Sequence, residues 1–259
     1  MISVIIPTLN EAENIAPLLR RIMGSQPIAD EIIFVDDGSI DGTRKRICSW
    51  SNSAPVRLIE RENSALGLSG AVIAGARAAR GDLLVVMDAD LSHPPEKIGE
   101  LLRPVATGTA DLVIGSRYVE GGSTPGWPIW RKIMSRIAAG FAYPLTGVHD
   151  SMCGFFAIRR TTLLELTPFA TGFKIAFEAI VHGGKQLRVL EIPIVFRERA
   201  RGTSKMSFGI ALRFAFRWLS AVARLRFRRS QVHSQGAAVF QPPLNNLEIA
   251  LPCHPVERN

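Results

Sequence analysis

The chain has 259 residues, of which 47% are hydrophobic and 21% are charged, a balance that excludes a disordered, collagenous or coiled-coil protein. The formal net charge is +8, but residues 1–196 are neutral overall and the excess of basic side chains lies in residues 197–229. This predicts a neutral body with a basic segment attached, and argues against a diffusely cationic nucleic-acid-binding protein. Three cysteines without a C-x-x-C pair exclude a disulfide framework and favour a reduced compartment. The residues before Glu11 have no basic leader of the kind that starts a signal peptide, so we expect a cytoplasmic protein.

Short apolar runs alternate with helical patterns along the first 200 residues. Seven runs, several of them unbroken stretches of β-branched residues and leucine, predict strands at 2–7, 31–36, 56–60, 83–88, 112–115, 155–158 and 187–195. Between them, helices are predicted at 11–23, 41–50, 66–79, 95–106 and 130–143. This alternation is typical of an α/β domain with a mostly parallel central sheet flanked by helices.

The segment 207–229 combines positive charge with a wide apolar surface. Arginines interrupt its apolar residues, so no run of about 18 apolar residues is available to span a bilayer. On a helix, Arg213, Arg217, Arg224 and Arg228 fall within a stripe roughly 60° wide. This favours a helix in a membrane interface; the alternative is a helix packed on its own domain with a solvated arginine edge. Residues 230–259 show no sustained period and predict a flexible tail.

The second predicted strand ends in an acidic pair, Asp36 and Asp37, at the edge of the sheet where parallel α/β proteins bind ligands. These carboxylates can accept hydrogen bonds from a ribose or a base, although Asp-Gly-Ser is also common in ordinary turns. No G-x-G-x-x-G follows the first strand, which argues against a dehydrogenase. The position of the pair at a strand end favours function over turn chemistry.

A second acidic pair, Asp88 and Asp90, lies at the end of the fourth predicted strand. Two carboxylates two residues apart on extended chain point to the same side and can bind one cation. Oxygen ligands favour Mg²⁺ or Mn²⁺, with water and a diphosphate in the remaining positions. His93 precedes Pro94 and Pro95 at the expected start of a helix, which favours a structural role over metal binding.

Basic residues at other strand ends predict a site for anionic oxygens. Arg117 follows the strand at 112–115, and Lys174 lies in the run Gly-Phe-Lys-Ile. Arg199 and Lys205 belong to the pattern R-x-x-G-x-S-K after the last strand. The glycine and serine between these cations allow backbone N–H groups to surround a phosphate. Any one of these residues alone reads as an ordinary surface charge, but three such clusters favour a shared site.

The motifs occur together in one known group of enzymes. The chain contains, in order, V-I-I-P-T-L-N-E, V-D-D-G-S-x-D-G-T, M-D-A-D-L-S-H-P-P-E, G-S-R-Y, G-F-K-I and R-x-x-G-x-S-K-M. It resembles a family 2 glycosyltransferase of the dolichyl-phosphate (polyprenyl-phosphate) mannosyltransferase type. The resemblance implies a GT-A (Rossmann-like) domain over residues 1–206, a nucleotide-sugar donor that is typically GDP-mannose, a divalent metal, and a lipid phosphate acceptor.

The resemblance also implies roles for individual residues. The nucleoside pocket is implied at Pro7, Leu9, Glu11, Val35 and Asp37, with Asp36 beside it. The donor diphosphate and metal are implied at Asp88, Ala89 and Asp90, and Ser92 stands where relatives carry a glutamine that helps to hold the metal. Donor and acceptor phosphates are implied at Arg117, Lys174, Arg199 and Lys205, and Asp90, Arg117, Arg199 and Lys205 are the implied catalytic residues. Leu9 replaces an aromatic residue that commonly stacks on the base.

The predicted function is the transfer of a sugar, mannose from GDP-mannose, to a polyprenyl or dolichyl phosphate by an inverting single displacement. A sugar hydroxyl would need a general base, whereas a phosphate monoester with a second pKa of about 6 is already mostly dianionic. The expected location is peripheral, on the cytoplasmic face of the membrane, and a membrane-protein partner is left open. The alternatives are a sibling enzyme that uses UDP-glucose or another UDP-sugar, a soluble family 2 transferase acting on a sugar hydroxyl, and a non-catalytic nucleic-acid-binding protein.

Overall fold

The computed structural model describes residues 1–62, 65–166, 170, 172 and 174–198. The predicted site residues Arg199 and Lys205, the predicted helix at 207–229 and the predicted tail at 230–259 lie outside the described residues. The described residues make up the α/β body of the chain.

In this part of the chain seven strands form one sheet in the order β3-β2-β1-β4-β6-β5-β7. The strands are β1 (Ile2–Thr8), β2 (Glu31–Asp36), β3 (Val56–Glu60), β4 (Leu83–Val86), β5 (Leu112–Ser116), β6 (Phe156–Arg159) and β7 (Val189–Pro193). Only β6 runs antiparallel to its neighbours β4 and β5, and all other strand pairs in the sheet are parallel. The predicted α/β fold with a mostly parallel sheet is confirmed, and each strand lies within two residues of its predicted bounds.

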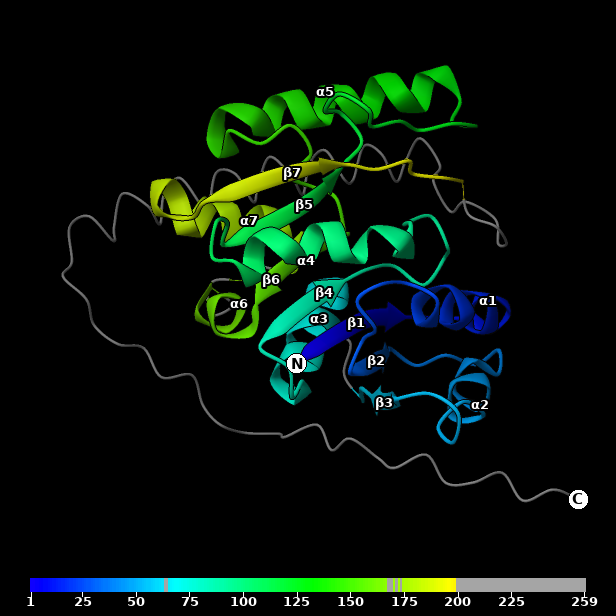
Figure 1. Ribbon diagram of the computed structural model, residues 1–259. Helices are drawn as coiled ribbons and strands as arrows, with labels where there is room; N and C mark the ends of the chain where they lie inside the picture. Colours follow the sequence, from blue (N-terminus) through cyan, green and yellow to red (C-terminus); the bar gives the residue numbers. More distant parts are fainter. Residues whose placement is uncertain (63–64, 167–169, 171, 173, 199–259) are drawn as a thin grey trace, which may run out of the picture.

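Helices cover both faces of the sheet, which explains why the central strands are apolar on both sides. One layer consists of α1 (Ala12–Met23), α2 (Thr43–Cys48), the short η1 (Pro95–Lys97) and α4 (Ile98–Ala106), and the other of α3 (Gly67–Ala78), α6 (Arg160–Leu166) and α7 (Ile175–Gly183). Figure 1 shows α4 in front of the sheet and α3 and α7 behind it. All six residues of β2 are buried between these layers.

The sequence did not predict α6 and α7. Helix α6 follows β6 without an intervening turn residue, so no start signal separates the two elements. Helix α7 begins with six consecutive buried residues and therefore lacks the one-sided apolar pattern by which an amphipathic helix is detected. A helix buried on all sides cannot be distinguished by periodicity from a buried strand.

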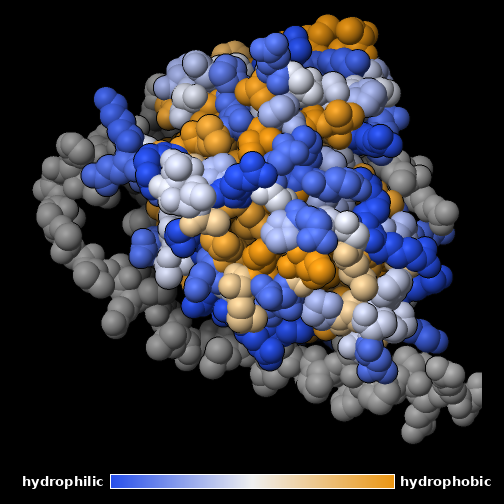
Figure 2. Space-filling view, viewed as in Figure 1, coloured by the Kyte–Doolittle hydropathy of each residue, from blue (hydrophilic) through white to orange (hydrophobic). Residues whose placement is uncertain are grey.

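Helix α5 (Ile129–Thr146) lies at the β7 end of the molecule and packs against α7 (Figure 1). Seven of its large apolar side chains are exposed, namely Ile129, Trp130, Ile133, Met134, Ile137, Phe141 and Tyr143. Figure 2 shows hydrophobic side chains on the surface in this region, at the top of the view. Among the helices that the structure describes, none combines the length and the hydropathy needed to cross a bilayer.

Candidate active site

The two acidic pairs lie along one edge of the sheet, as the sequence predicted. Strands β1 and β2 end together, with Thr8 opposite Asp36 in the parallel register. The amide of Asp37 donates a hydrogen bond of 3.0 Å to the carbonyl of Thr8. Strand β4 pairs with the other side of β1, so that Asp88 follows at the same edge. The crevice outside these carboxyl ends is the usual ligand site of an open α/β sheet.

Asp36 shapes the turn that follows β2. Its side chain is fully buried, and one carboxylate oxygen accepts hydrogen bonds from the amides of Gly38 (3.2 Å) and Ser39 (3.0 Å). Arg44 pairs with the same oxygen at 2.6 Å. Because the side chain is enclosed, Asp36 acts on the site by fixing the turn beside the predicted nucleoside pocket.

Asp37 is held by an arginine that the sequence analysis missed. The Nη1 atom of Arg61 lies 2.6 Å from Asp37 Oδ1, and the Arg61 side chain is only 3% exposed. The same guanidinium donates to the carbonyl oxygens of Ala65 (2.6 Å) and Gly67 (3.1 Å). Arg61 therefore connects the carboxyl end of β2 to the loop that begins α3.

The turn after β1 carries the other residues predicted to line the nucleoside pocket. Asn10 adopts a left-handed backbone with φ of 57° and is tied to the turn after β2, through its amide to Ser39 Oγ at 2.8 Å and its side-chain oxygen to the amide of Ile40 at 2.9 Å. Leu9 is half exposed at this turn. Glu11 accepts a hydrogen bond of 2.6 Å from the Asn14 side chain. Pro7 and Val35 lie opposite each other near the carboxyl ends of β1 and β2.

The Asp88–Ser92 turn is a strained and closely held segment. Leu91 adopts a left-handed backbone with φ of 65°, which costs about 1–2 kcal/mol for a residue with a side chain. Oδ1 of Asp90 accepts hydrogen bonds from the amide (3.0 Å) and the hydroxyl (2.5 Å) of Ser92, and both side chains are buried. Ser92 thus supports Asp90, while its role as a metal ligand stays a prediction. Ala89 is buried between the two acids.

His93 has the structural role that the sequence favoured. Its Nδ1 accepts a hydrogen bond of 3.0 Å from the amide of Asp88, which places the ring proton on Nε2, 3.8 Å from the Cys153 sulfur. The ring stacks on Phe155 at 5.2 Å and meets the edge of Phe196 at 5.3 Å. Burial lowers the pKa of His93 despite the nearby carboxylates, so the imidazole is neutral at pH 7.

A chamber of about 380 Å³ opens beside this turn. Asp88 and Asp90 line one end of it, and three cations, Arg117, Arg131 and Lys174, lie on its walls. The remaining wall is largely apolar and comes from α5, with Trp130, Met134, Ile137, Ala138 and Phe141 among its residues. The chamber therefore joins an acidic end, a basic middle and an apolar surface that continues to the outside of the protein.

Arg117 is held in the chamber by a buried ion pair with Asp150. Its Nε and Nη2 atoms each lie 2.7 Å from a carboxylate oxygen of Asp150, and its amide donates to the same carboxylate at 2.9 Å. Asp150 is 1% exposed. Burial opposes the charge on Arg117, but the hydrogen bonds and the charge of Asp150 raise its pKa well above the ordinary value. The rings of Tyr118, Trp127 and Phe196 surround the guanidinium at 5.1–5.4 Å.

The family model of glycosyl transferase family 2 matches residues 3–167 of the chain. The chain belongs to glycosyl transferase family 2. It is 44% identical over 79% of its length to a dolichol-phosphate mannosyltransferase of Pyrococcus furiosus, of which it spans 59%. It is 38% identical to the dolichol-phosphate mannosyltransferase of Mycosarcoma maydis, over 87% of this chain and 79% of that protein. The predicted resemblance is confirmed, and the chain is a glycosyltransferase of this type.

Solved structures confirm the GT-A fold of this family 2 glycosyltransferase. The glucosyl-3-phosphoglycerate synthase of Mycobacterium tuberculosis, in complex with Mn²⁺, UDP and glucosyl-3-phosphoglycerate, superposes with a TM-score of 0.68. The comparison covers 87% of this chain and 79% of the synthase at 19% identity. A likeness at that level of identity establishes the shared fold alone.

The site of the transferase has residues suited to an oxygen-binding divalent cation. In the described ranges, no group of three or more His, Cys, Asp and Glu side chains is arranged to hold a metal. Two carboxylates, Asp88 and Asp90, do line the chamber together. Mg²⁺ is commonly held by one or two carboxylates, with water and substrate phosphate oxygens completing its shell. The pair fits that mode of binding.

The structure brings four of the predicted residues into one chamber and adds others that the sequence analysis missed. Asp88, Asp90, Arg117 and Lys174 all line the chamber. The missed residues are Asp150, Arg131, Ser135 and Trp127, and Arg131 lies 4.0 Å above the Trp127 ring. Arg131 and Ser135 are four residues apart on the predicted helix at 130–143, so helical spacing could have placed them on one face. No local pattern marks Asp150, which is 33 residues from Arg117.

Proposed function

We propose that this family 2 glycosyltransferase transfers mannose from GDP-mannose to a polyprenyl or dolichyl phosphate. The observation that carries the proposal is the chamber, in which the Asp88–Asp90 end, three cations and the apolar wall of α5 line one space. The names of the relatives, which include a polyprenol monophosphomannose synthase of Mycolicibacterium smegmatis at 40% identity, support mannose as the sugar and a polyprenyl phosphate as the acceptor. The chamber separately supports a diphosphate donor and a lipid phosphate acceptor, because it combines two carboxylates, three cations and an apolar wall.

The donor would lie along the edge of the sheet from β2 to β4. Pro7, Leu9, Glu11, Val35 and Asp37 hold the nucleoside in this proposal, with Asp36 fixing the adjacent turn. Asp88 and Asp90 hold the diphosphate together with Mg²⁺ or Mn²⁺, and Ser92 fixes the Asp90 carboxylate. When bound, the cation would stabilise the negative charge of the leaving nucleoside diphosphate.

None of the described residues that line the chamber offers a carboxylate suited to act as a base toward a sugar hydroxyl. Among the described residues that line it, Asp88 and Asp90 are the proposed diphosphate and metal residues, and Asp150 is paired with Arg117 through both of its oxygens. His93 Nδ1 already accepts the amide of Asp88. A phosphate monoester is mostly dianionic at pH 7 and needs no such base. This favours the lipid phosphate over the soluble transferase acting on a hydroxyl.

The acceptor phosphate would lie among the cations of the chamber. Arg117, Arg131 and Lys174 offset the repulsion between the phosphate and the donor diphosphate, because oppositely charged side chains in a partly enclosed site interact strongly. Asp150 keeps the guanidinium of Arg117 in a fixed orientation. The phosphate oxygen then attacks the anomeric carbon in line with the leaving diphosphate, which inverts that carbon in a single displacement. The predicted roles of Arg199 and Lys205 as further phosphate ligands remain part of the proposal.

The lipid chain would leave the chamber along α5 toward a membrane surface. The exposed apolar side chains of α5 alternate with basic residues, including Lys132 and Arg136, a composition typical of helices that lie in a membrane interface. In the proposal the predicted basic helix at 207–229 adds a second contact, and the enzyme works at the cytoplasmic face. A membrane-protein partner is left open.

Transfer of radiolabelled sugar into extractable lipid tests the proposal. GDP-mannose and UDP-glucose are each incubated with the protein and a polyprenyl phosphate, with and without EDTA. We expect label from GDP-mannose in the lipid fraction and its loss on removal of the metal. Label from UDP-glucose alone would establish the sibling enzyme instead. In a parallel reaction with a free sugar in place of the lipid, transfer of label to that sugar would overturn the lipid phosphate acceptor.

Flotation with vesicles tests the membrane contact of α5. Phe141→Ser removes an exposed ring of α5, and Ile28→Ser, on the loop before β2, is the matched control because the two residues are 64% and 62% exposed. We expect Phe141→Ser to lower the fraction that floats with vesicles containing anionic phospholipid and Ile28→Ser to leave it unchanged. Equal flotation of both variants would contradict the contact.

A further inference from the structure

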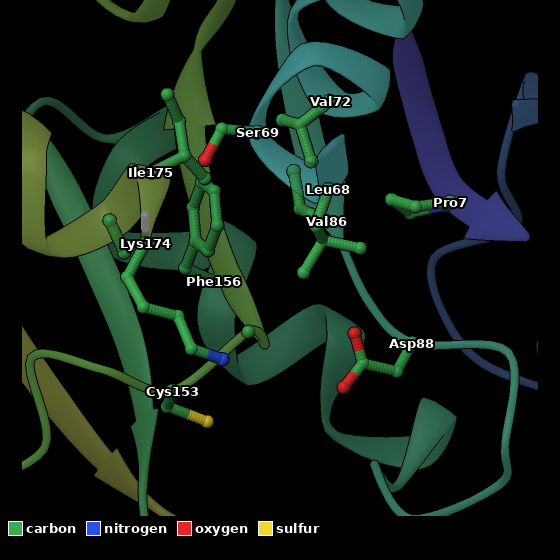
Figure 3. Close-up of a pocket in the computed structure, with 12 residues that line it drawn as sticks. Pro7, Leu68, Ser69, Val72, Val86, Asp88, Cys153, Phe156, Lys174 and Ile175 are labelled. Atoms are coloured by element: carbon green, nitrogen blue, oxygen red, sulfur yellow. The ribbon is translucent and has the colours of Figure 1, made fainter. Parts of the chain in front are cut away.

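A small recess opens beside the chamber, between the first turn of α3 and the start of α7 (Figure 3). It has a volume of about 10 Å³, which is room for about one water-sized group. Asp88, Cys153, Gly154 and Lys174 line both the recess and the chamber, so the two spaces are neighbours. In Figure 3 the Ser69 hydroxyl lies at one end of the recess, and Asp88 and the Lys174 amine lie at the other.

The hydroxyl of Ser69 lacks a hydrogen-bond partner in this recess. Ser69 is 1% exposed, and its oxygen contacts no donor or acceptor among the residues that the structure describes. A buried hydroxyl left in this state costs about 1–3 kcal/mol, so such groups normally bond to a protein atom, a water or a ligand. The recess therefore offers one hydrogen bond that the folded chain does not itself satisfy.

The first turn of α3 adds a favourable field for an oxygen atom. Ser69 is the third residue of this 12-residue helix, and no side chain in the described ranges caps its start. Amides in the first turn of a helix carry a partial positive charge and favour electron-rich ligand atoms. The other walls are apolar, with Leu68, Val72 and Phe156 among them, and leave room for a single hydroxyl group.

We propose that the recess binds one hydroxyl of the sugar that is transferred, with Ser69 as its hydrogen-bonding residue. The inference rests on the proposed function, because the chamber beside the recess is the place where the sugar leaves its diphosphate. Of the residues proposed to hold the nucleoside, Pro7 lines the recess, whereas Leu9, Glu11, Val35 and Asp37 do not. Asp88 and Lys174, which line the chamber, both line the recess as well.

Gly154 keeps the recess open toward the chamber. A Cβ atom at this position would lie 3.2 Å from Oδ1 of Asp88 and 3.5 Å from the His93 ring. A side chain here would therefore intrude on the passage between Ser69 and the proposed diphosphate site. With the passage open, Ser69 selects the donor by its sugar rather than by its nucleotide.

Comparison of two ligands separates the sugar from the nucleotide. The affinities of the full chain for GDP-mannose and GDP are measured by calorimetry in Mn²⁺, with wild type, Ser69→Ala and Ser151→Ala. Ser151 is the matched control, since its hydroxyl is also 1% exposed and without a partner in the described structure, but it lines neither space. We expect Ser69→Ala to weaken GDP-mannose about tenfold and leave GDP unchanged, because a lost hydrogen bond is worth about 1–2 kcal/mol. Ser151→Ala should change neither.

Deoxy-mannose donors identify the hydroxyl. One GDP-deoxymannose should bind wild type about tenfold more weakly than GDP-mannose and show no further loss in Ser69→Ala, because both changes remove the same hydrogen bond. Equal weakening of GDP and GDP-mannose by Ser69→Ala would overturn the inference in favour of the nucleoside, and no weakening of either would overturn it altogether. Failure of wild type to bind any nucleotide sugar would refute the proposed function itself. If Ser69→Ala fails to fold, Ser69→Cys, whose side chain is close to serine in size, takes its place. The same ratio of the affinities for GDP-mannose and GDP then decides the outcome.

Discussion

Replacing Asp150 with asparagine removes the charge that holds Arg117 in the chamber. The carboxylate of Asp150 accepts three hydrogen bonds from Arg117 at 2.7–2.9 Å, and the side chains are 1% and 11% exposed. Removing one partner of a buried ion pair costs about 3–5 kcal/mol, because the remaining charge stays buried without compensation. Asparagine keeps the shape and one acceptor oxygen, so we expect the free energy of unfolding to fall by about 2–4 kcal/mol.

Asp111→Asn is a control with the same bonding in a different environment. Arg188 donates to Asp111 through its amide (2.9 Å), Nε (3.0 Å) and Nη2 (2.7 Å), which is the pattern that Arg117 makes with Asp150. The Arg188 side chain is 58% exposed, so water replaces the lost interaction and the effect on stability should be far smaller. The two variants thus isolate the contribution of burial.

Urea denaturation followed by tryptophan fluorescence measures the free energy of unfolding of both variants, Asp150→Asn and Asp111→Asn. A loss of 3 kcal/mol in Asp150→Asn corresponds to a fall in Tm of roughly 6–12 °C for a chain of this size. We also expect mannosyl transfer to fall at substrate concentrations that saturate wild type, because Arg117 loses its fixed orientation. If Asp150→Asn and Asp111→Asn lower the stability equally, burial does not govern the Arg117 pair and the reasoning is refuted.

Three further outcomes test other parts of the site. Gly154→Ala places a Cβ 3.2 Å from a carboxylate oxygen of Asp88, and by shifting that carboxylate it should slow metal-dependent transfer about tenfold. Gly24→Ala is the control, because its Cβ comes no nearer than 3.4 Å to another atom at the end of α1, and it should not slow transfer. Equal rates for the two variants would contradict the assignment of Asp88. Burial lowers the pKa of His93 below its value of about 6.5 in the unfolded chain. As the pH falls below that value, His93 gains a proton in the unfolded chain but not in the folded one. The free energy of unfolding should therefore decline by up to about 1.4 kcal/mol per pH unit. His93→Asn should flatten this decline in denaturation curves between pH 7 and 5, and an unchanged slope would show that His93 is not its source. Arg131→Met should raise the KM for the lipid phosphate about tenfold in transfer assays while leaving the Kd of GDP-mannose unchanged, and the reverse pattern would place Arg131 at the donor.

The strands and the acidic edge of the sheet could be predicted because local sequence determines them. Unbroken apolar runs such as that of β2 mark strands covered on both faces, and acids that directly follow such runs must lie at the carboxyl edge of the sheet. This reasoning places Asp37 and Asp88 from the sequence alone. It does not place their partners, since Arg61 is 24 residues from Asp37 and no local pattern connects them.

The rest of the chamber depends on tertiary packing. Lys174 precedes α7 and lies beside Asp88 across the recess, yet the sequence of α7 lacks the one-sided apolar pattern that predicts a helix. No pattern in the sequence around Asp150 indicates a partner, and only the fold places its carboxylate against Arg117. The unsatisfied hydroxyl of Ser69 is likewise visible only when every neighbouring side chain is placed.

A crystal structure with Mn²⁺, GDP and a short-chain polyprenyl phosphate tests the central claim most directly. The account predicts an anomalous difference peak in contact with Asp88 and Asp90, and the lipid phosphate in the chamber near Arg131 and Lys174 with its chain leaving along α5. A metal bound away from both carboxylates, or a lipid phosphate outside the chamber, would contradict it.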